Sequence, residues 1–101
     1  MTEQQFNDIT KWQRETFPNA QPTSKLSHLS EELEELHFEL SHPTDNLRLE
    51  FADCFLLLFG CASSAGMTYG DICMAIDEKM EINRRRKWGQ PDENGVVKHI
   101  D

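Results

Sequence analysis

The sequence predicts an all-α protein in which two central helices form an antiparallel hairpin. Apolar residues recur at helical spacing in four stretches of the chain, and turn-forming residues separate these stretches. The loop over residues 41–45 is short, which favours antiparallel packing of the helices that flank it. In both flanking stretches, carboxylates border the apolar stripe instead of pointing away from it. We therefore treat these two helices, expected over residues 25–41 and 45–65, as the centre of the fold.

Length and charge restrict the organisation and the partners of the protein. A chain of 101 residues predicts one domain, residues 1–101. Such a short chain buries only about 60–65% of its unfolded surface, so the wide apolar faces of its helices predict a core completed by self-association, in a homodimer or a dimer of dimers. The net charge is −8, with 18 acidic and 10 basic residues. This balance argues against nucleic acid as a general partner.

Three features indicate a cytoplasmic protein. The N-terminus lacks the basic-then-apolar pattern of a signal peptide. The most apolar run, residues 51–65, contains Asp53 and is too short to span a bilayer, so no membrane partner is expected. The three cysteines show no CxxC spacing, which argues against a zinc site and fits small core residues in a reducing compartment; they are Cys54, Cys61 and Cys73.

Capping residues and breakers set the expected helix ends. The first helix is expected over residues 2–16, with Thr2 as its N-cap and Gln5 as the capping-box partner. The fourth is expected over residues 69–87. Further cap candidates, by helix, are Thr23 or Ser24 for the second, Thr44 or Asp45 for the third, Gly66 after the end of the third, and Thr68 for the fourth.

The segment after the fourth helix is rich in turn residues. Gly89 and Pro91 end the helical pattern, and Asn94-Gly95 precedes two valines. Asn-Gly is a strong hairpin signal, so residues 89–101 form either a small hairpin or a loose tail.

Two acidic motifs lie on the central helices. The first is Glu31-Glu32-Leu33-Glu34-Glu35, and the second is Glu50-Phe51-Ala52-Asp53. At roughly 100° per residue, Glu32 and Glu35 share one helix face, as do Glu50 and Asp53. If the helices pack as a hairpin, four carboxylates converge beside the core, where unpaired charges cost several kcal/mol or take up protons. Divalent cations with oxygen ligands such as Mg²⁺ would compensate this charge. Exposed acidic helices, however, often carry such motifs without a metal.

A cationic counterpart lies on the fourth helix. Lys79, Asn83 and Arg86 fall within about 60° of one another, bordering an apolar face. A Lys, an amide and an Arg together make a plausible polyphosphate clamp. The alternative is a basic last turn that complements the helix dipole, which describes Arg84 and Arg85 better.

The order EExxE, ExxD and KxxxNxxRxWG resembles the MazG-like, all-α nucleoside triphosphate pyrophosphohydrolases. The last motif reads from Lys79 to Gly89. Three further stretches are similar to the phage MazZ-type dATP/dGTP diphosphohydrolases: Trp12–Pro18, Ser27–Leu29, and Trp88–Asp92 with the end His99-Ile100. The resemblance covers nearly the whole chain, and the acidic and basic motifs in this order are specific for the superfamily.

This resemblance implies an enzyme that cleaves between the α and β phosphates of a nucleoside triphosphate. Two or more Mg²⁺ or Mn²⁺ ions would neutralise the triphosphate and activate water. The residues implied to hold them are Glu32, Glu35, Glu50 and Asp53. Glu31 could orient or deprotonate the attacking water, or simply face solvent. Lys79, Asn83 and Arg86 would hold the phosphates and sugar.

Four flanking residues have less defined roles. Trp12 could stack on the base or pack between helices, and Trp88 has the same two alternatives. Gln13, or backbone groups near Phe17, could supply the polar contacts that distinguish bases. His28, one turn before Glu32, is expected to support the carboxylates rather than to bind metal.

The sequence thus predicts a Mg²⁺-dependent hydrolase of dATP and dGTP, in the host cytoplasm if the gene is a phage gene. One alternative is a housecleaning pyrophosphatase for other or modified deoxynucleotides, of the dUTP or dCTP type. A second is a non-catalytic helical module that binds cations or a basic partner.

Overall fold

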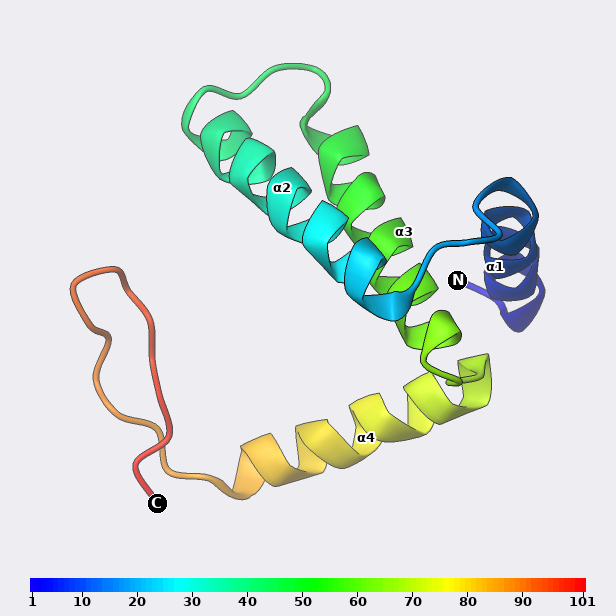
Figure 1. Cartoon of the computed structure of the whole chain (residues 1–101). Helices are drawn as coiled ribbons and strands as arrows, with labels where there is room; N and C mark the ends of the chain where they lie inside the picture. The colour runs from blue at the N-terminus through cyan, green and yellow to red at the C-terminus, as the bar shows by residue number, and fades with distance from the viewer. The chain divides into compact units, whose positions relative to one another are not determined.

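The computed structural model describes residues 1–101 and contains four α-helices (Figure 1). They are α1 (Glu3–Thr16), α2 (Pro22–Ser41), α3 (Leu47–Ser64) and α4 (Tyr69–Arg85). The chain divides into two compact units, Met1–Gly70 and Asp71–Asp101, which are described in turn. No single helix is long and apolar enough to cross a membrane; only α3 and α4, taken together as a bent pair, reach the necessary length and composition. The predicted all-α, four-helix architecture is confirmed.

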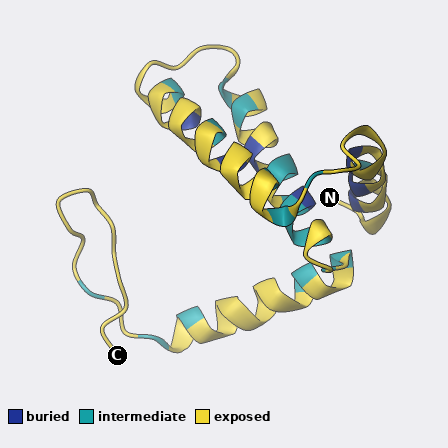
Figure 2. Ribbon diagram, viewed as in Figure 1, coloured by how far each residue is buried: buried dark blue, intermediate teal, exposed yellow.

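In the first unit, α2 and α3 lie side by side as an antiparallel hairpin (Figure 1). Its core consists of Leu29, Leu36 and Cys54, with Leu47 and Leu57 packed against them. The buried residues Leu29 and Leu36 of α2 pack against Cys54 of α3, whereas much of the surface of both helices is exposed (Figure 2). The predicted apolar stripe on α2 is only partly correct, because Leu33 and Leu40 remain exposed at the surface of the chain.

The hairpin turn is held by side chains on both sides of it. The Glu39 carboxylate accepts hydrogen bonds from the backbone N–H and the hydroxyl of Thr44, the former at 2.9 Å. The Thr44 hydroxyl oxygen accepts from the backbone N–H of Asn46 at 3.2 Å. Thr44 therefore stabilises the turn rather than the first turn of α3, whose N-cap is Asn46. The prediction of Thr44 or Asp45 as the cap was wrong.

The remaining boundaries follow from backbone preferences. The second helix begins at Pro22 rather than at residue 25, because proline fits the first helical position, where no N–H partner is needed. Thr23 and Ser24 consequently lie inside the first turn and do not cap it. Gly66 has φ 98°, the left-handed conformation expected just after α3. The fourth helix ends at Arg85 instead of residue 87.

The first helix packs on α3 through an aromatic contact. Phe6 is 2% exposed, and its ring centroid lies 5.9 Å from that of Phe59 and 5.7 Å from that of Tyr69. The helix begins as predicted, because the Gln5 backbone N–H donates to the Thr2 hydroxyl at 3.1 Å. This packing places the remaining turns of α1 along α3.

In the second unit, the segment after α4 folds back on itself. The Gly89 N–H donates to the Lys98 carbonyl at 2.8 Å, and the Ile100 N–H donates to the Lys87 carbonyl at 2.9 Å. At the far end, the Asp92 carboxylate accepts from the backbone of Asn94 and Val96. Of the two alternatives, the hairpin is therefore correct in outline, although its pairing is limited to one bridge between Trp88 and His99.

Candidate active site

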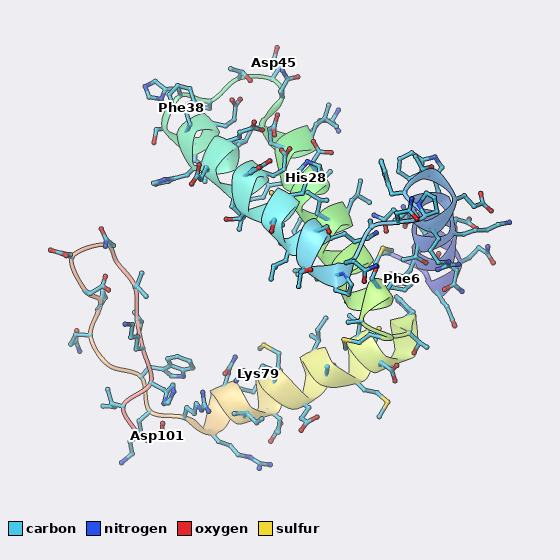
Figure 3. All side chains as sticks on the ribbon, in the orientation of Figure 1. Phe6, His28, Phe38, Asp45, Lys79 and Asp101 are labelled. Carbon is cyan, nitrogen blue, oxygen red and sulfur yellow. The ribbon has the colours of Figure 1, made fainter.

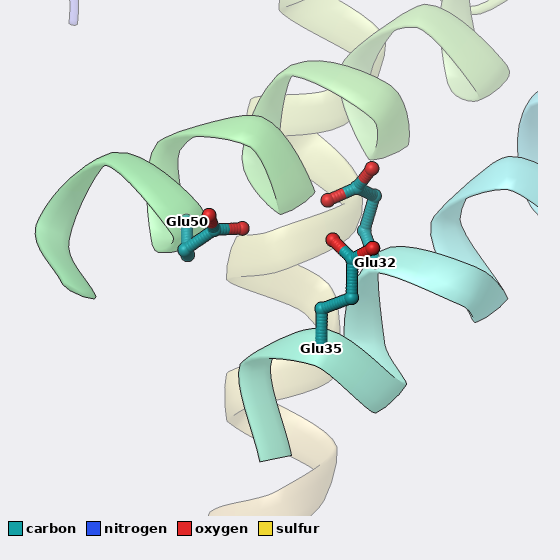
Figure 4. Close-up of side chains that lie close together, drawn as sticks. All are labelled: Glu32, Glu35 and Glu50. Carbon is teal, nitrogen blue, oxygen red and sulfur yellow. The ribbon is translucent and has the colours of Figure 1, made fainter. Parts of the chain in front are cut away.

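Three of the four predicted metal-binding carboxylates converge between α2 and α3. Glu32 and Glu35 point from α2 toward Glu50 on α3 (Figure 4). One carboxylate oxygen from each lies within 4.8 Å of the others. The spacing of three residues places the two α2 side chains on one face, and the hairpin brings Glu50 opposite them. Such a set of oxygen donors suits a hard divalent cation.

The electrostatics of this cluster centre on Glu32. Burial raises the pKa of the Glu32 carboxyl, and so do its hydrogen bond with Glu35 and the negative charges of Glu35 and Asp53, whereas His28 lowers it. The buried Cys54 thiol lies behind the cluster, and its pKa is raised by burial and then by the charges of Glu32, Asp53 and Glu50. Both pKa shifts come first from burial and then from the neighbouring negative charges, and a bound cation would offset those charges. The residues present therefore fit a divalent metal.

His28 lies beside the cluster rather than within it. Its Nε2 atom is 3.3 Å from a Glu32 carboxylate oxygen, one helical turn away on α2 (Figure 3). This contact orients the Glu32 side chain. Glu31, the proposed water-orienting residue, is exposed and lies outside the three converging carboxylates.

A hollow of about 530 Å³ opens next to the carboxylates, in the angle between α1 and the hairpin. Glu32 and Asp53 line one part of it, so the fourth predicted carboxylate shares this site with the cluster. Trp12 and Phe17 form an aromatic wall, with ring centroids 5.7 Å apart and nearly perpendicular planes. A volume of this size and apolar character suits a nucleoside.

Trp12 belongs to this wall and not to the core of the chain. It is 58% exposed, so the alternative of core packing is wrong for the single chain. Asp8, to which the sequence assigned no role, also lines the hollow and lies one turn before Trp12 on α1. Spacing of four residues on a helix could have indicated it.

Gln13 is almost fully buried beneath the wall. It is 7% exposed, and its side-chain amide donates to the Leu56 carbonyl of α3 at 2.9 Å. Its Oε1 atom is buried and has no hydrogen-bond partner. Both Gln13 and Leu56 line the hollow. The amide donor of Gln13 is therefore engaged by the protein in this conformation.

The predicted phosphate-binding residues lie in the second unit. On α4, Lys79 is exposed and Asn83 is half-buried, and Arg86 follows just after the helix (Figure 3). None of the three forms an ion pair within this unit, whereas Arg84 and Arg85 pair with Glu81 on their own helix. The Trp88 indole N–H donates to the Asn83 carbonyl at 3.0 Å, so Trp88 contacts the end of α4. The role of Lys79, Asn83 and Arg86 on phosphates stays a prediction.

The fold of the chain matches that of a known class of enzyme. The chain aligns with the solved structure of the Cyanophage S-2L MazG-like pyrophosphohydrolase bound to dGDP and three catalytic Mn²⁺ ions per active site. The TM-score is 0.80 and the identity 30%, over 100% of this chain and 99% of that one. The fold and the site thus define a MazG-like nucleotide pyrophosphohydrolase.

The amino-acid sequence identifies one family within this class. The model of the dATP/dGTP pyrophosphohydrolase family matches residues 5–101, and the chain belongs to this family. It is 32% identical to the dATP/dGTP diphosphohydrolase of Cyanophage S-2L over 92% of this chain and 82% of that protein. It is also 36% identical to the dATP/dGTP diphosphohydrolase of Salmonella phage PMBT28, over 91% of this chain and 29% of that longer protein.

Proposed function

We propose that the protein hydrolyses dATP and dGTP to the deoxynucleoside monophosphate and pyrophosphate, with Mg²⁺ or Mn²⁺ as cofactor. The observation that carries this proposal is the convergence of Glu32, Glu35 and Glu50 beside a hollow with an aromatic wall. The carboxylates supply a place for cations and phosphates, and the hollow supplies an adjacent place for the base. Family membership supports the same reaction.

The metal-holding residues in this proposal are Glu32, Glu35, Glu50 and Asp53. Four carboxylates in so small a space call for two or more divalent ions to balance their charge. When bound, such ions neutralise phosphoryl oxygens and lower the pKa of a coordinated water. The three Mn²⁺ ions of the Cyanophage S-2L enzyme support a site with several metals.

The other residues bind substrate and position water. Trp12 stacks on the base, since an exposed indole beside the hollow offers a flat apolar surface. Lys79, Asn83 and Arg86 hold the phosphates and the sugar through charge and planar donor geometry. Glu31 orients the attacking water or accepts its proton. His28 keeps Glu32 in place through their 3.3 Å contact.

We further propose that residues 1–101 act as one enzyme domain in a homo-oligomer, a dimer or a dimer of dimers. The exposed apolar residues on the outer faces of α2 and α3 support a shared core. For the location we propose the cytoplasm, which is the host cytoplasm for a phage gene. The relatives from two phages support this location.

The test is pyrophosphate release from dATP, dGTP, dCTP and dTTP at equal concentrations with Mg²⁺, and with EDTA as the control. We expect faster release from the two purine substrates and none with EDTA. If all four are hydrolysed within about a factor of two, the purine assignment is wrong and the housecleaning alternative replaces it. If none releases pyrophosphate, the non-catalytic alternative replaces both.

A further inference from the structure

The Gln13 side chain occupies a single turn of α3. Its Nε2 atom donates to the Leu56 carbonyl at 2.9 Å, and its Oε1 atom lies over Gly60, one turn further along. A Cβ atom at Gly60 would lie 2.7 Å from Oε1 and 3.0 Å from the amide carbon. Glycine at this position is therefore what gives the amide room to lie against the helix.

Fold stability alone does not explain an amide at this position. A buried acceptor without a partner costs about 1–3 kcal/mol, and Oε1 is such an acceptor. An unbranched apolar side chain of the same length would fill the space without that cost. An amide adds direction, because its N–H must meet one particular carbonyl. The aromatic contacts between α1 and α3 have no comparable preference for one register.

The helices joined by this contact carry the two sides of the candidate site. Gln13 follows directly after Trp12 on α1, and Leu56 lies one turn after Asp53 on α3. All four line the same hollow. The amide contact thus fixes the position of the aromatic wall relative to the carboxylates.

We propose that Gln13, seated on Gly60, is a positioning residue that sets the separation between the base site and the phosphate site and thereby favours purine substrates. This inference rests on the proposed function, and adds to it the residue pair that determines substrate fit. A fixed separation selects for how far the base extends from the sugar, and a bicyclic base extends further than a monocyclic one. Gln13 acts through Trp12 and does not itself need to contact the base.

Gln13→Met tests this role, because Met fills a similar space without hydrogen bonds. We expect KM for dATP and dGTP to rise about tenfold, with kcat nearly unchanged and the preference over dCTP reduced. The Tm should be equal or higher, because the unpaired acceptor is gone. Binding of Mn²⁺ alone, followed by electron paramagnetic resonance, should not change. An unchanged KM would show that Gln13 has only a structural role and would overturn the proposal.

A double-mutant cycle tests the contact between the Gln13 amide and Gly60. In the Gly60→Ala variant the new methyl group must displace the Gln13 amide, so KM should rise as in Gln13→Met. In a Gln13→Ala background, Gly60→Ala should have no further effect on KM, because no amide is present to displace. Additive effects would contradict the proposal. Gly70→Ala is the matched control, since a Cβ there would meet only the Thr68 hydroxyl at 3.8 Å, and KM should stay unchanged.

Trp12 fluorescence separates a failure of this inference from a failure of the proposed function. In a Trp88→Phe background, Trp12 is the remaining tryptophan, and its emission reports the environment of the wall without substrate. Gln13→Met and Gly60→Ala should shift that emission. Absence of pyrophosphate release by the wild-type protein rejects the proposed function, whereas unchanged emission in these variants rejects the positioning role of Gln13.

Discussion

Glu32 is the residue in which the chemistry of the site is concentrated. It contacts His28, forms a hydrogen bond with Glu35, and lines the hollow together with Asp53. Each of these neighbours comes from helical spacing on α2 or from the antiparallel pairing with α3. Burial raises its pKa first, and the neighbouring carboxylates Glu35 and Asp53 raise it further. A site of this kind exchanges stability of the metal-free protein for affinity toward metal.

Amide substitutions in the cluster should separate activity from stability. Glu35→Gln and Asp53→Asn remove one charge each and keep the shape of the side chain. We expect kcat/KM to fall by about two orders of magnitude or more, because each is proposed to hold metal. In metal-free buffer the Tm should be unchanged or higher, since repulsion is reduced. Glu34→Gln, an exposed neighbour on α2, is the control and should keep full activity. An amide variant of the cluster with full activity would contradict the assignment.

The raised pKa of Glu32 predicts a pH dependence in metal-free buffer. The pKa of Glu32 in the folded protein lies above its ordinary value of 4.5, so folding disfavours the ionised form. Glu32 therefore lowers the free energy of unfolding by its full amount at pH values above its pKa in the folded protein. This destabilisation disappears as the pH falls to the pKa of the unfolded chain. The Tm difference between wild type and Glu32→Gln should therefore shrink on acidification from neutral pH toward about 4.5, and shrink likewise with saturating Mg²⁺. Thermal melts of both proteins across this range measure it, and a pH-independent difference would be inconsistent with the raised pKa.

Trp12→Ala should distinguish a base platform from a structural residue. Because Trp12 is 58% exposed, its loss should leave the Tm nearly unchanged. A buried Trp would instead cost about 3–5 kcal/mol. The loss of stacking, worth about 1–3 kcal/mol, should lower kcat/KM for dATP and dGTP by the corresponding factor. Trp12→Phe should retain most of the wild-type kcat/KM. Steady-state kinetics with a parallel thermal melt decide between the two roles.

The sequence predicts which residues share a face of one helix, but it does not predict contacts between segments that lie far apart in the chain. Helical periodicity placed Glu32 and Glu35 on one face, and the short loop brought Glu50 to them. The Gln13–Leu56 bond joins residues 43 positions apart, and nothing in local spacing indicates it. The place of Gly60 beneath Gln13 was missed for the same reason.

At the scale of whole elements, the spacing of apolar residues predicted the number and order of the helices. The capping residues, in contrast, predicted several helix ends wrongly. The preference of proline for the first helical turn moved the start of α2 to Pro22. Thr44 has a hydroxyl suited to capping, but Glu39 engages it within the hairpin turn. Such competition between partners depends on tertiary proximity, which propensity scales do not contain.

The end of α4 offers a prediction at this scale. The Trp88 indole N–H donates to the Asn83 carbonyl, one of the last carbonyls of the helix, and its ring contacts His99 edge-on. Trp88→Phe keeps a ring but loses the donor, which should weaken the end of α4 by about 0.5–1.5 kcal/mol. Amide hydrogen exchange over residues 83–89 should accelerate accordingly. Trp12→Phe, on α1, is the control, and unchanged exchange in Trp88→Phe would show that this bond does not hold the helix end.

At the scale of the whole molecule, the distribution of apolar residues points to self-association. The hairpin buries Leu29, Leu36 and Cys54 on its inner side, yet large apolar residues also line its outer side. On α3 the exposed residues Phe51, Phe55 and Leu58 recur at helical spacing, so they form one continuous face. A single chain that exposes such a face in water would be prone to association. A symmetric partner with the same face would bury it.

We therefore expect light scattering at micromolar concentration to give a mass of at least twice 11.7 kDa. Phe55→Glu places a charge in the centre of the apolar α3 face, where Phe55 is 56% exposed in the single chain. Because burying an unpaired carboxylate is costly, this variant should shift the protein toward monomer and lower its Tm in a concentration-dependent way. Val96→Glu introduces the same charge at an exposed position in the C-terminal segment, outside the helices, and should leave the mass unchanged. A wild-type protein that is both monomeric and fully active at this concentration would show that the outer face of the hairpin has another role.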